Sequence, residues 1–360
     1  MMTNKKIAFV IHSLGRGGAE KVVSELSIYW QKKGYELTII VFDNEIGYPI
    51  AGRLINLNLP SGFGFIERGL ILLRRAWQLK KVYQKNKFDL IIAVMETASF
   101  PSILANHQTV ASNHCNPDLY FSKAEWKIAS YLFPKTKKVV CVSQVAMQAF
   151  KNKLTNSIGL ITIYNPVDFE RLNFYAKQTA KIKLEGKYII AVGRLEQQKR
   201  LDRLIQAYAD SKLKYEAKLL ILGEGSLRNK LQEQIKNLNL LEQVLMPGNI
   251  ENPHPNIAGA EFLALSSDHE GFPMVLIEAL AIGKPVISTD CATGPNEIIQ
   301  HGHNGLLVPV ENTLALRDAL DELYFNKALH QYLSINAAAS VAHLSIDAIA
   351  ANWEALAWRG

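Results

Sequence analysis

Cysteine is scarce in this chain of 360 residues, and it is not arranged for cross-linking. Only Cys115, Cys141 and Cys291 occur, and none belongs to a CxxC pair or to a Cys/His cluster with metal-ligand spacing. An odd number of widely separated cysteines argues against both a disulfide framework and a structural zinc site. The sequence therefore favours a reducing, cytoplasmic environment.

Long apolar runs are also missing. No stretch reaches the roughly 18 apolar residues of a membrane-spanning helix, and the strand-like run Ile7–Ile11 lies too close to Met1 for a signal-peptide core. We therefore expect neither a membrane span nor export. The 22 glycines and 13 prolines, with 48% hydrophobic and 20% charged residues, exclude collagen-like or largely disordered chains. A folded protein of about two domains is expected at this length.

Acidic residues are few in the first half. Residues 1–168 contain 21 Lys and Arg against 11 Asp and Glu, whereas residues 169–360 contain 19 against 22. The basic excess gathers in residues 65–87, where seven cations accompany a single acid, Glu67. The acidic second half and the lack of an aromatic RNA-binding motif argue against a nucleic-acid partner.

Residues 65–87 have the pattern of a basic amphipathic helix. At ~100° per residue, one side collects mainly apolar residues and the other mainly cations. Two interpretations remain open, a solvated surface helix or contact with anionic lipid or a polyanionic acceptor. The apolar side is predicted to be Ile66, Leu70, Leu72, Leu73, Trp77, Leu79 and Tyr83, and the basic side Arg68, Arg74, Arg75, Lys81 and Lys85.

Short apolar runs alternate with helical patterns in both halves, which predicts an α/β fold of two Rossmann-like, doubly wound parallel sheets. The boundary is placed near residue 169, after an Asn-Pro pair, giving domains 1–168 and 169–345 and a last helix within 346–360. The predicted strands are Ile7–His12, Leu37–Phe42, Leu90–Val94, Val110–Ser112, Val139–Val142, Tyr188–Val192, Lys218–Leu222, Val244–Met246, Phe262–Ser266, Pro285–Ser288 and Leu306–Val308.

Open parallel sheets bind ligands beyond the carboxyl ends of their strands, so a site is expected in a cleft between two such units. The first strand is followed by a glycine-rich turn with Gly17 and Gly18, which suits a phosphate or a sugar hydroxyl at a helix start. It is not a dinucleotide fingerprint, because Glu20 occupies the position of the third glycine. A strand-to-helix turn without a ligand remains the alternative.

Two cations follow the first strand of the second half. Arg194 and Lys199, five residues apart, are placed to converge on a diphosphate, although such a pair is more often solvated.

Two carboxylates flank a helix start later in the chain. Glu270 stands just before the start and Glu278 over a turn inside it, so both side chains can reach one pocket and grip vicinal hydroxyls. Asp268, with Glu270 beside it, makes too thin a ligand set for Mg²⁺. Exposed backbone N–H groups for an anion are expected over residues 271–275, from Gly271, Phe272, Met274 and Val275, with Pro273, which has no N–H, opening the helix.

In their order over residues 7–310, these pieces resemble one known family, the retaining GT-B nucleotide-sugar glycosyltransferases of the "family four" type. Those enzymes are common in bacterial lipopolysaccharide, capsule and lipid-linked oligosaccharide synthesis. Each motif is weak alone, but the ordered set is specific. The matching elements are Gly17-Gly18-Ala19-Glu20, Ser112-Asn113-His114, Asn165-Pro166-Val167-Asp168, Gly193-Arg194 with Lys199, Glu270 with Glu278, Gly294-Pro295 with Glu297, and Asn304-Gly305-Leu306.

The resemblance implies a role for each matching residue. Arg194 and Lys199 would neutralise the donor diphosphate, Glu278 would hold the ribose, and Glu270 the donor sugar. The amides of residues 271–275 would bind sugar and phosphate. His114 would stand beside the sugar. The remaining assignments are Gly17 and Gly18 against phosphate or acceptor, and Gly248 and Asn249 beside the base.

The same resemblance implies a catalytic function. The expected enzyme is a metal-independent, cofactor-free retaining transferase that moves a hexose or N-acetylhexosamine from a UDP-sugar to a glycan. The glycan is expected to be lipid-linked, and the enzyme to lie near the inner membrane. GDP or ADP donors stay open. A UDP-sugar epimerase and a catalytically silent glycan- or nucleotide-binding homologue are the alternatives. The first domain would bind the acceptor and the second the donor, and the segment Ser345–Trp358 would cross back onto the first domain.

Overall fold

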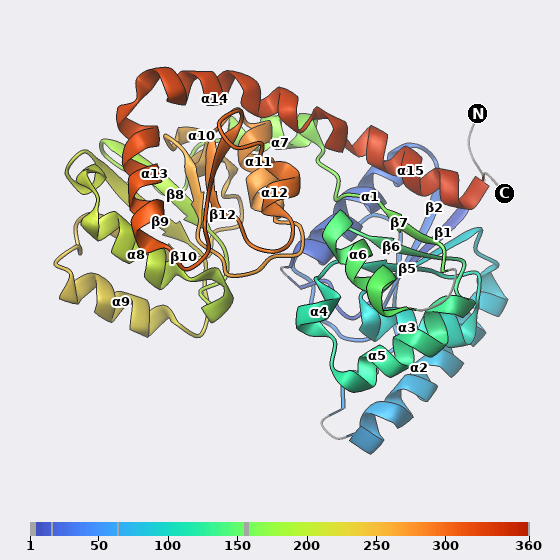
Figure 1. Ribbon diagram of the computed structural model, residues 1–360. Helices are drawn as coiled ribbons and strands as arrows, with labels where there is room; N and C mark the ends of the chain where they lie inside the picture. The colour runs from blue at the N-terminus through green and yellow to red at the C-terminus, as the bar shows by residue number, and fades with distance from the viewer. Residues whose placement is uncertain (1–4, 16, 63–64, 155–157, 359–360) are drawn as a thin grey trace. The chain divides into compact units, whose positions relative to one another are not determined.

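A computed structural model describes residues 5–15, 17–62, 65–154 and 158–358 (Figure 1). The chain folds as two compact units. Unit 1 contains the residues up to Pro166 and those from Ile346 onward, and unit 2 contains Val167–Ser345. No helix in the described ranges is both long and apolar enough to cross a membrane.

Unit 1 is built on a seven-stranded parallel sheet in the order β3-β2-β1-β4-β5-β6-β7. The five predicted strands are present, and the short strands β3 and β7, at the two edges, were not predicted. Both are only partly buried, so their apolar signal is weak. The strands are β1 Lys6–Ile11, β2 Glu36–Val41, β3 Arg53–Asn56, β4 Leu90–Val94, β5 Val110–Asn113, β6 Lys138–Cys141 and β7 Leu160–Thr162.

Helices cover both faces of this sheet, and the last one comes from the end of the chain. Helix α15 packs against α1 (Figure 1), where Tyr29 Oη donates to Asp347 at 2.7 Å and Trp30 Nε1 to Glu354 at 3.0 Å. The helices of unit 1 are α1 Gly18–Lys32, α2 Phe65–Asn86, α3 Glu96–Ala105, α4 Pro117–Tyr120, α5 Lys123–Leu132, α6 Gln144–Lys153 and α15 Ile346–Trp358.

Unit 2 is built on a six-stranded parallel sheet in the order β10-β9-β8-β11-β12-β13, and all six of its predicted strands are present. The strands are β8 Lys187–Val192, β9 Ala217–Leu222, β10 Val244–Gly248, β11 Leu263–Leu265, β12 Val286–Thr289 and β13 Gly305–Val308. The helices are α7 Phe169–Ala176, α8 Leu201–Asp210, α9 Arg228–Asn237, α10 His254–Gly259, α11 Met274–Ala281, α12 Pro295–Ile298, α13 Thr313–Phe325 and α14 Lys327–Ser340.

The strand order places a ligand crevice in each unit. In both sheets the first strand lies between the second strand and a later one, β1 between β2 and β4, and β8 between β9 and β11. Chain connections leave in opposite directions at such a point, which opens a crevice at the carboxyl ends of the two strands. The predicted pair of Rossmann-like sheets is therefore confirmed.

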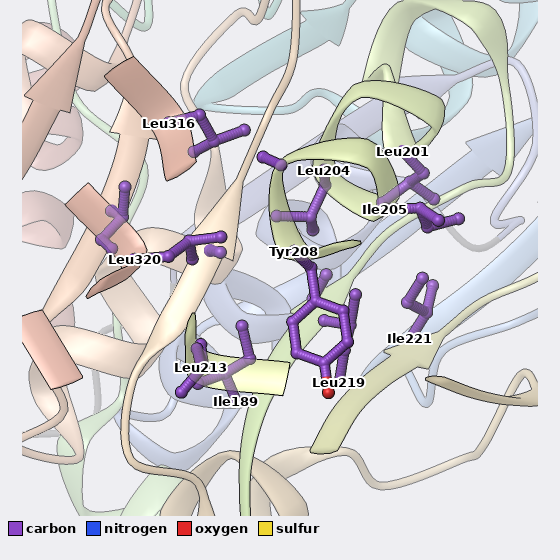
Figure 2. Close-up of a cluster of buried hydrophobic side chains, with 14 of the residues drawn as sticks. Ile189, Leu201, Leu204, Ile205, Tyr208, Leu213, Leu219, Ile221, Leu316 and Leu320 are labelled. Atoms are coloured by element: carbon purple, nitrogen blue, oxygen red, sulfur yellow. The ribbon is translucent and has the colours of Figure 1, made fainter. Parts of the chain in front are cut away.

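Helix α8 closes the main core of unit 2. Its apolar side chains lie over the central strands and meet helix α13 on the other side (Figure 2). Tyr208 is fully buried, and its hydroxyl donates to the carbonyl oxygen of Ala217 at 2.7 Å. The cluster fixes β8, whose carboxyl end leads into the predicted donor site. Its labelled members are Ile189, Leu201, Leu204, Ile205, Tyr208, Leu213, Leu219, Ile221, Leu316 and Leu320.

Helix α2 has the predicted bounds, but its orientation differs from the prediction. Arg75, placed on the basic side, is 95% buried: its guanidinium donates to the carbonyl of Leu59 at 2.9 and 2.6 Å and lies 4.1 Å from the Phe42 ring centroid. Burial of this cation lowers its pKa to about 10. The carbonyl acceptors and the aromatic ring replace the water that Arg75 loses.

The opposite face of α2 is apolar and exposed. Leu70, Leu73 and Trp77, which were placed on the apolar side, are 51%, 61% and 56% exposed, while Leu79 and Tyr83 from the same side are buried. The side chain of Ile66 lies outside the described residues. Positions i, i+3 and i+7 share one helix face, so the three form a single stripe, which we call the α2 stripe.

We expect truncation in the core of unit 2 to be costly. Replacing the fully buried Leu204 by alanine should lower the free energy of unfolding by about 2–5 kcal/mol, because it removes apolar contacts and leaves a cavity. Urea denaturation measures this change. The control is Leu241→Ala, since Leu241 is 66% exposed and should change stability by less than about 0.5 kcal/mol. Equal effects of the two variants would contradict the packing described.

Candidate active site

A buried ion pair lies at the carboxyl ends of β8 and β11. The ammonium of Lys199 donates to Oε1 of Glu270 at 2.6 Å, and the hydroxyl of Ser267 donates to the same oxygen at 2.5 Å. The two charged side chains are only 15% and 7% exposed. The fold therefore joins two of the predicted site residues, which are 71 positions apart, at the switch point of the sheet.

A second group of charged residues fixes the loops that carry Lys199 and Glu270. Asp268 accepts from Arg200 at 3.0 Å and from Arg203 at 2.8 Å. Burial alone would raise the pKa of Asp268, but hydrogen bonds from Arg203 and Arg200 lower it below its ordinary value. Asp268 therefore anchors the turn after β8 to the end of β11, and the two arginines are functional supports that no motif predicted.

The loop around Glu270 is packed by a second predicted motif. Gly294 has a φ of +91°, and a Cβ there would lie 2.7 Å from Cδ of Pro273 and 2.9 Å from the carbonyl oxygen of Gly271. Only glycine allows both this backbone conformation and this approach. The hydroxyl of Thr293 donates to the carbonyl of Glu270. The Gly294-Pro295 element thus supports Glu270.

Helix α11 begins beside this loop. Pro273 is its N-cap residue and Met274 its first residue, so the start of the helix stands at the carboxyl end of β11, as predicted for residues 271–275. Phe272, Pro273 and Met274 are buried, and Gly271 and Val275 are partly buried.

Glu278 lies in the second turn of α11 and is 6% exposed. Its Oε2 is 3.3 Å from Nε2 of His254, a residue of helix α10. His254 is itself buried and stacks on Tyr175, with the ring planes 13° apart. No sequence motif indicated His254, because its only relation to Glu278 is a contact across the fold.

Arg194 is exposed, unlike Lys199. The chain passes from β8 through Gly193, where a Cβ would lie 3.4 Å from Cε of Lys199, so the lysine side chain runs over this glycine. Among the described residues, no hydrogen bond or ion pair joins Arg194 to Glu270 or Glu278. The structure therefore brings Lys199 and Glu270 together and leaves Arg194 at the solvent-facing edge of the same strand end.

The two residues predicted beside the base lie at the end of β10. Gly248 is buried with a φ of +99°, and a Cβ there would lie 2.6 Å from Oε1 of Glu224. Its carbonyl accepts from the backbone N–H of Gly223 at 3.0 Å. Asn249 is exposed. Because β10 is two strands from β8 in the sheet, both residues share the carboxyl edge with Lys199.

The predicted residues of unit 1 lie at the carboxyl edge of the other sheet. Gly17 is the N-cap of α1 and Gly18 its first residue, and a Cβ on Gly17 would clash with the carboxylate of Glu20. His114 follows β5, and its Nε2 lies 2.9 Å from the hydroxyl of Ser112. Burial lowers the pKa of His114 to about 4 while Asn165 opposes the shift, so the ring is neutral at pH 7.

The described residues contain no group of three or more His, Cys, Asp and Glu side chains that could hold a metal ion.

The fold agrees with comparisons to known families. Residues 16–171 match the model "Glycosyltransferase Family 4", and residues 175–340 match "Glycosyl transferases group 1". A Campylobacter jejuni protein is 33% identical over 90% of this chain and 94% of its own length. The chain belongs to glycosyltransferase family 4. The predicted family resemblance is confirmed.

The relatives of this glycosyltransferase act on bacterial glycans. The Campylobacter protein is the N-acetylgalactosamine-N,N'-diacetylbacillosaminyl-diphospho-undecaprenol 4-alpha-N-acetylgalactosaminyltransferase. The lipopolysaccharide 1,6-galactosyltransferase of Escherichia coli K12 is 28% identical, over 84% of each chain.

Solved structures confirm the GT-B fold. The sucrose-phosphate synthase of Thermosynechococcus elongatus matches with a TM-score of 0.82 at 18% identity, over 98% of each chain. Anabaena HepE, solved with UDP and glucose, matches with a TM-score of 0.77 at 19% identity, over 97% of this chain and 98% of its own.

The buried pair should be tested by a double-mutant cycle on the glycosyltransferase. Glu270→Ala or Lys199→Met alone should lower the free energy of unfolding by about 3–5 kcal/mol, because each leaves a buried charge without its partner. The double variant should lose clearly less than the sum of the two. Asp318→Ala, which breaks the exposed pair with Arg317, is the control and should cost less than about 1 kcal/mol. Additive effects in urea denaturation would rule out the coupling.

Proposed function

We propose that this glycosyltransferase moves a hexose or N-acetylhexosamine from a UDP-sugar to a lipid-linked glycan, with retention of anomeric configuration and without a metal ion. The observation that carries the proposal is the buried Lys199–Glu270 pair at the carboxyl ends of β8 and β11, next to the start of α11, the helix that carries Glu278. The relatives that act on undecaprenol-linked and lipopolysaccharide glycans support the acceptor class, and HepE, bound to UDP, supports the donor class.

Charge neutralisation is the first step that the geometry serves. In the free protein Lys199 is neutralised by Glu270. A diphosphate entering the site would share this ammonium, while exposed Arg194 would turn its guanidinium onto the same group. As the bond from the sugar to the diphosphate breaks, negative charge grows on the leaving UDP, and these cations stabilise it more in the transition state than in the ground state. They would supply the charge that a metal ion provides elsewhere.

Retention is proposed to follow from attack on the same face that UDP leaves. The acceptor hydroxyl forms the new bond to the anomeric carbon as the sugar–phosphate bond breaks, and its proton passes to the departing phosphate oxygen. Glu270 would hold the sugar hydroxyls, and neutral His114 of unit 1 would offer a hydrogen bond without adding charge. The amides at the start of α11 would hold the sugar and phosphate oxygens.

The α2 stripe supports a membrane surface as the second partner. Leu70, Leu73 and Trp77 are exposed together, and Arg68, Arg74, Lys80, Lys81 and Lys85 are exposed around them. The Lys81 ammonium lies 3.3 Å from the Trp77 ring centroid. An apolar stripe within a basic rim is what binding at an anionic lipid interface requires. Unit 1 would thereby meet its acceptor at the inner membrane, on the cytoplasmic side, where the three buried free cysteines stay reduced.

Turnover with a panel of nucleotide-sugars tests the proposed reaction. UDP release should require a lipid-linked glycan, and Arg194→Ala should lower kcat/KM by about 100- to 1000-fold because it removes transition-state charge stabilisation. Arg317→Ala, at a partly exposed arginine on α13, is the matched control and should leave kcat/KM unchanged. EDTA should have no effect, and NMR of the product should show the donor's anomeric configuration. An inverted linkage, or consumption of UDP-sugar without acceptor, would contradict the proposal.

Sedimentation with vesicles tests the membrane surface. Leu73→Ser with Trp77→Ser should reduce binding to phosphatidylglycerol-containing vesicles at least about tenfold, because the variant loses the apolar contacts. Arg74→Glu with Lys80→Glu and Lys81→Glu should do the same by charge reversal, at about 1 kcal/mol per cation. Arg75 is left intact because it is buried.

The control for the vesicle measurement is Tyr215→Ser with Leu241→Ser, two apolar residues of unit 2 that are 80% and 66% exposed. This variant should bind as the parent does. Unchanged sedimentation of both α2 variants would show that the helix is only solvated.

A further inference from the structure

The buried carboxylate of Glu278 shares its environment with the imidazole ring of His254. His254 Nε2 lies 3.3 Å from Glu278 Oε2, and the two residues are 8% and 6% exposed. Within the described residues, Glu278 supplies the only carboxylate within ion-pairing distance of this ring. The protonation of the ring therefore decides whether Glu278 has a neutral or a cationic neighbour.

The second ring nitrogen faces another acceptor. Nδ1 of His254 lies 2.8 Å from Oδ1 of Asn252, which also accepts the backbone N–H of His254 at 3.2 Å. The orientation of this amide is set by its nitrogen, which donates to the carbonyl of Tyr175 at 3.3 Å and to Oε1 of Gln178 at 2.9 Å. Because the amide nitrogen is used by these acceptors, the oxygen must be the atom that faces His254.

These hydrogen-bond partners indicate how many protons the His254 ring carries. An amide oxygen and a carboxylate oxygen only accept hydrogen bonds, so each nitrogen that faces one needs a proton, whereas a neutral imidazole carries a single proton. The competing arrangement moves one proton onto Glu278. Two protons on the ring let both of its nitrogens donate and leave both facing oxygens as acceptors, with the carboxylate ionised.

We propose that His254 is held as an imidazolium and is the positioning residue that keeps Glu278 ionised and turned toward the ribose of the donor. This inference rests on the proposed role of Glu278 as the ribose-binding carboxylate. An ionised carboxylate accepts hydrogen bonds from both hydroxyls of a vicinal diol, whereas a protonated one offers a donor in place of an acceptor. His254 thus acts on the ribose through Glu278 and does not touch the reacting bond.

The other groups around the ring are compatible with a cation. From α7, Tyr175 stacks on the ring with centroids 6.1 Å apart, and Arg171 lies 5.4 Å from the far ring, that of the tyrosine. From β8, the neutral Tyr188 donates its hydroxyl to the carbonyl of Asn256 at 2.7 Å. From α11 comes Glu278 itself. Arg171 also donates to the hydroxyl of Tyr175 at 3.3 Å, so a tyrosine side chain, rather than a direct contact, joins this cation to the imidazole ring.

Binding of UDP and 2′-deoxy-UDP to the full chain, measured by calorimetry, tests the proposal. The parent protein should prefer UDP by about tenfold, the worth of a hydrogen bond to a charged group. His254→Gln and His254→Ala should lose this preference and bind UDP about tenfold more weakly, with 2′-deoxy-UDP within about twofold of the parent. The donor KM should rise by a similar factor at nearly constant kcat, since the chemical step is untouched.

The matched control is His303→Gln, a histidine of unit 2 whose ring meets Tyr332 rather than a carboxylate. It should bind both nucleotides as the parent does. A His254→Gln protein that keeps the preference for UDP, or that loses affinity for both nucleotides equally, overturns the positioning role.

A measurement on the unaltered protein does not depend on whether the variants fold. The ¹⁵N NMR signals of His254 at pH 7 should show a proton on both ring nitrogens, and a ring with one proton would overturn the inference. If the parent protein binds no UDP, the proposed donor is wrong, while the NMR signals still decide the state of His254.

Discussion

A lysine and a glutamate share one hydrogen bond out of water at the carboxyl ends of β8 and β11, and the candidate site is arranged around them. The pair is stable only because the surrounding residues supply the hydrogen bonds and the space that it needs. Ser267 adds a second hydrogen bond to Glu270, and glycines at positions 193 and 294 leave room for the lysine stem and for the glutamate loop. Burying two charges costs several kcal/mol per ion unless the geometry and the added hydrogen bonds repay it.

The other acidic residues near this pair also have partners of their own. Asp268 takes two arginines and has a structural role, whereas Glu278 takes His254 and stays at the site. Each acid of the loop and helix that follow β11 thus has a different cationic partner. In the proposed function, this separation would let one short segment of chain both hold its shape and present carboxylates to a sugar nucleotide. Arg194 differs because it stays in water, where it can move onto an arriving diphosphate at little cost.

Much of the fold is predictable because central parallel strands are continuous apolar runs, as in β1, β4 and β8. The edge strands β3 and β7 were missed, since they are short and half-exposed. The orientation of α2 was wrong for a different reason. The helical period of the segment was clear. A helical wheel counts Arg75 as polar, however, and cannot show that its guanidinium contacts the carbonyl oxygen of Leu59 and the ring of Phe42. Buried cations are recognisable only from their surroundings.

The residues of the candidate site also differ in how well the sequence predicts them. Ordered motifs pointed to Lys199, Glu270 and Glu278 because these residues stand at strand and helix ends, where glycine and proline mark the backbone. Asn252 and His254 lie in the run Asn252-Pro253-His254-Pro255, which belongs to none of these motifs, and the link of His254 to Glu278 is a contact between α10 and α11. The residues that orient a functional group are harder to find from sequence than the group itself, because orientation depends on packing between distant segments.

A crystal structure of the full chain with UDP tests the central claim most directly. The account predicts the diphosphate within hydrogen-bonding distance of Lys199 Nζ, with Arg194 turned onto it, and the ribose hydroxyls on the carboxylate of Glu278. UDP bound elsewhere, with the Lys199–Glu270 pair undisturbed and Glu278 remote from the nucleotide, would contradict it.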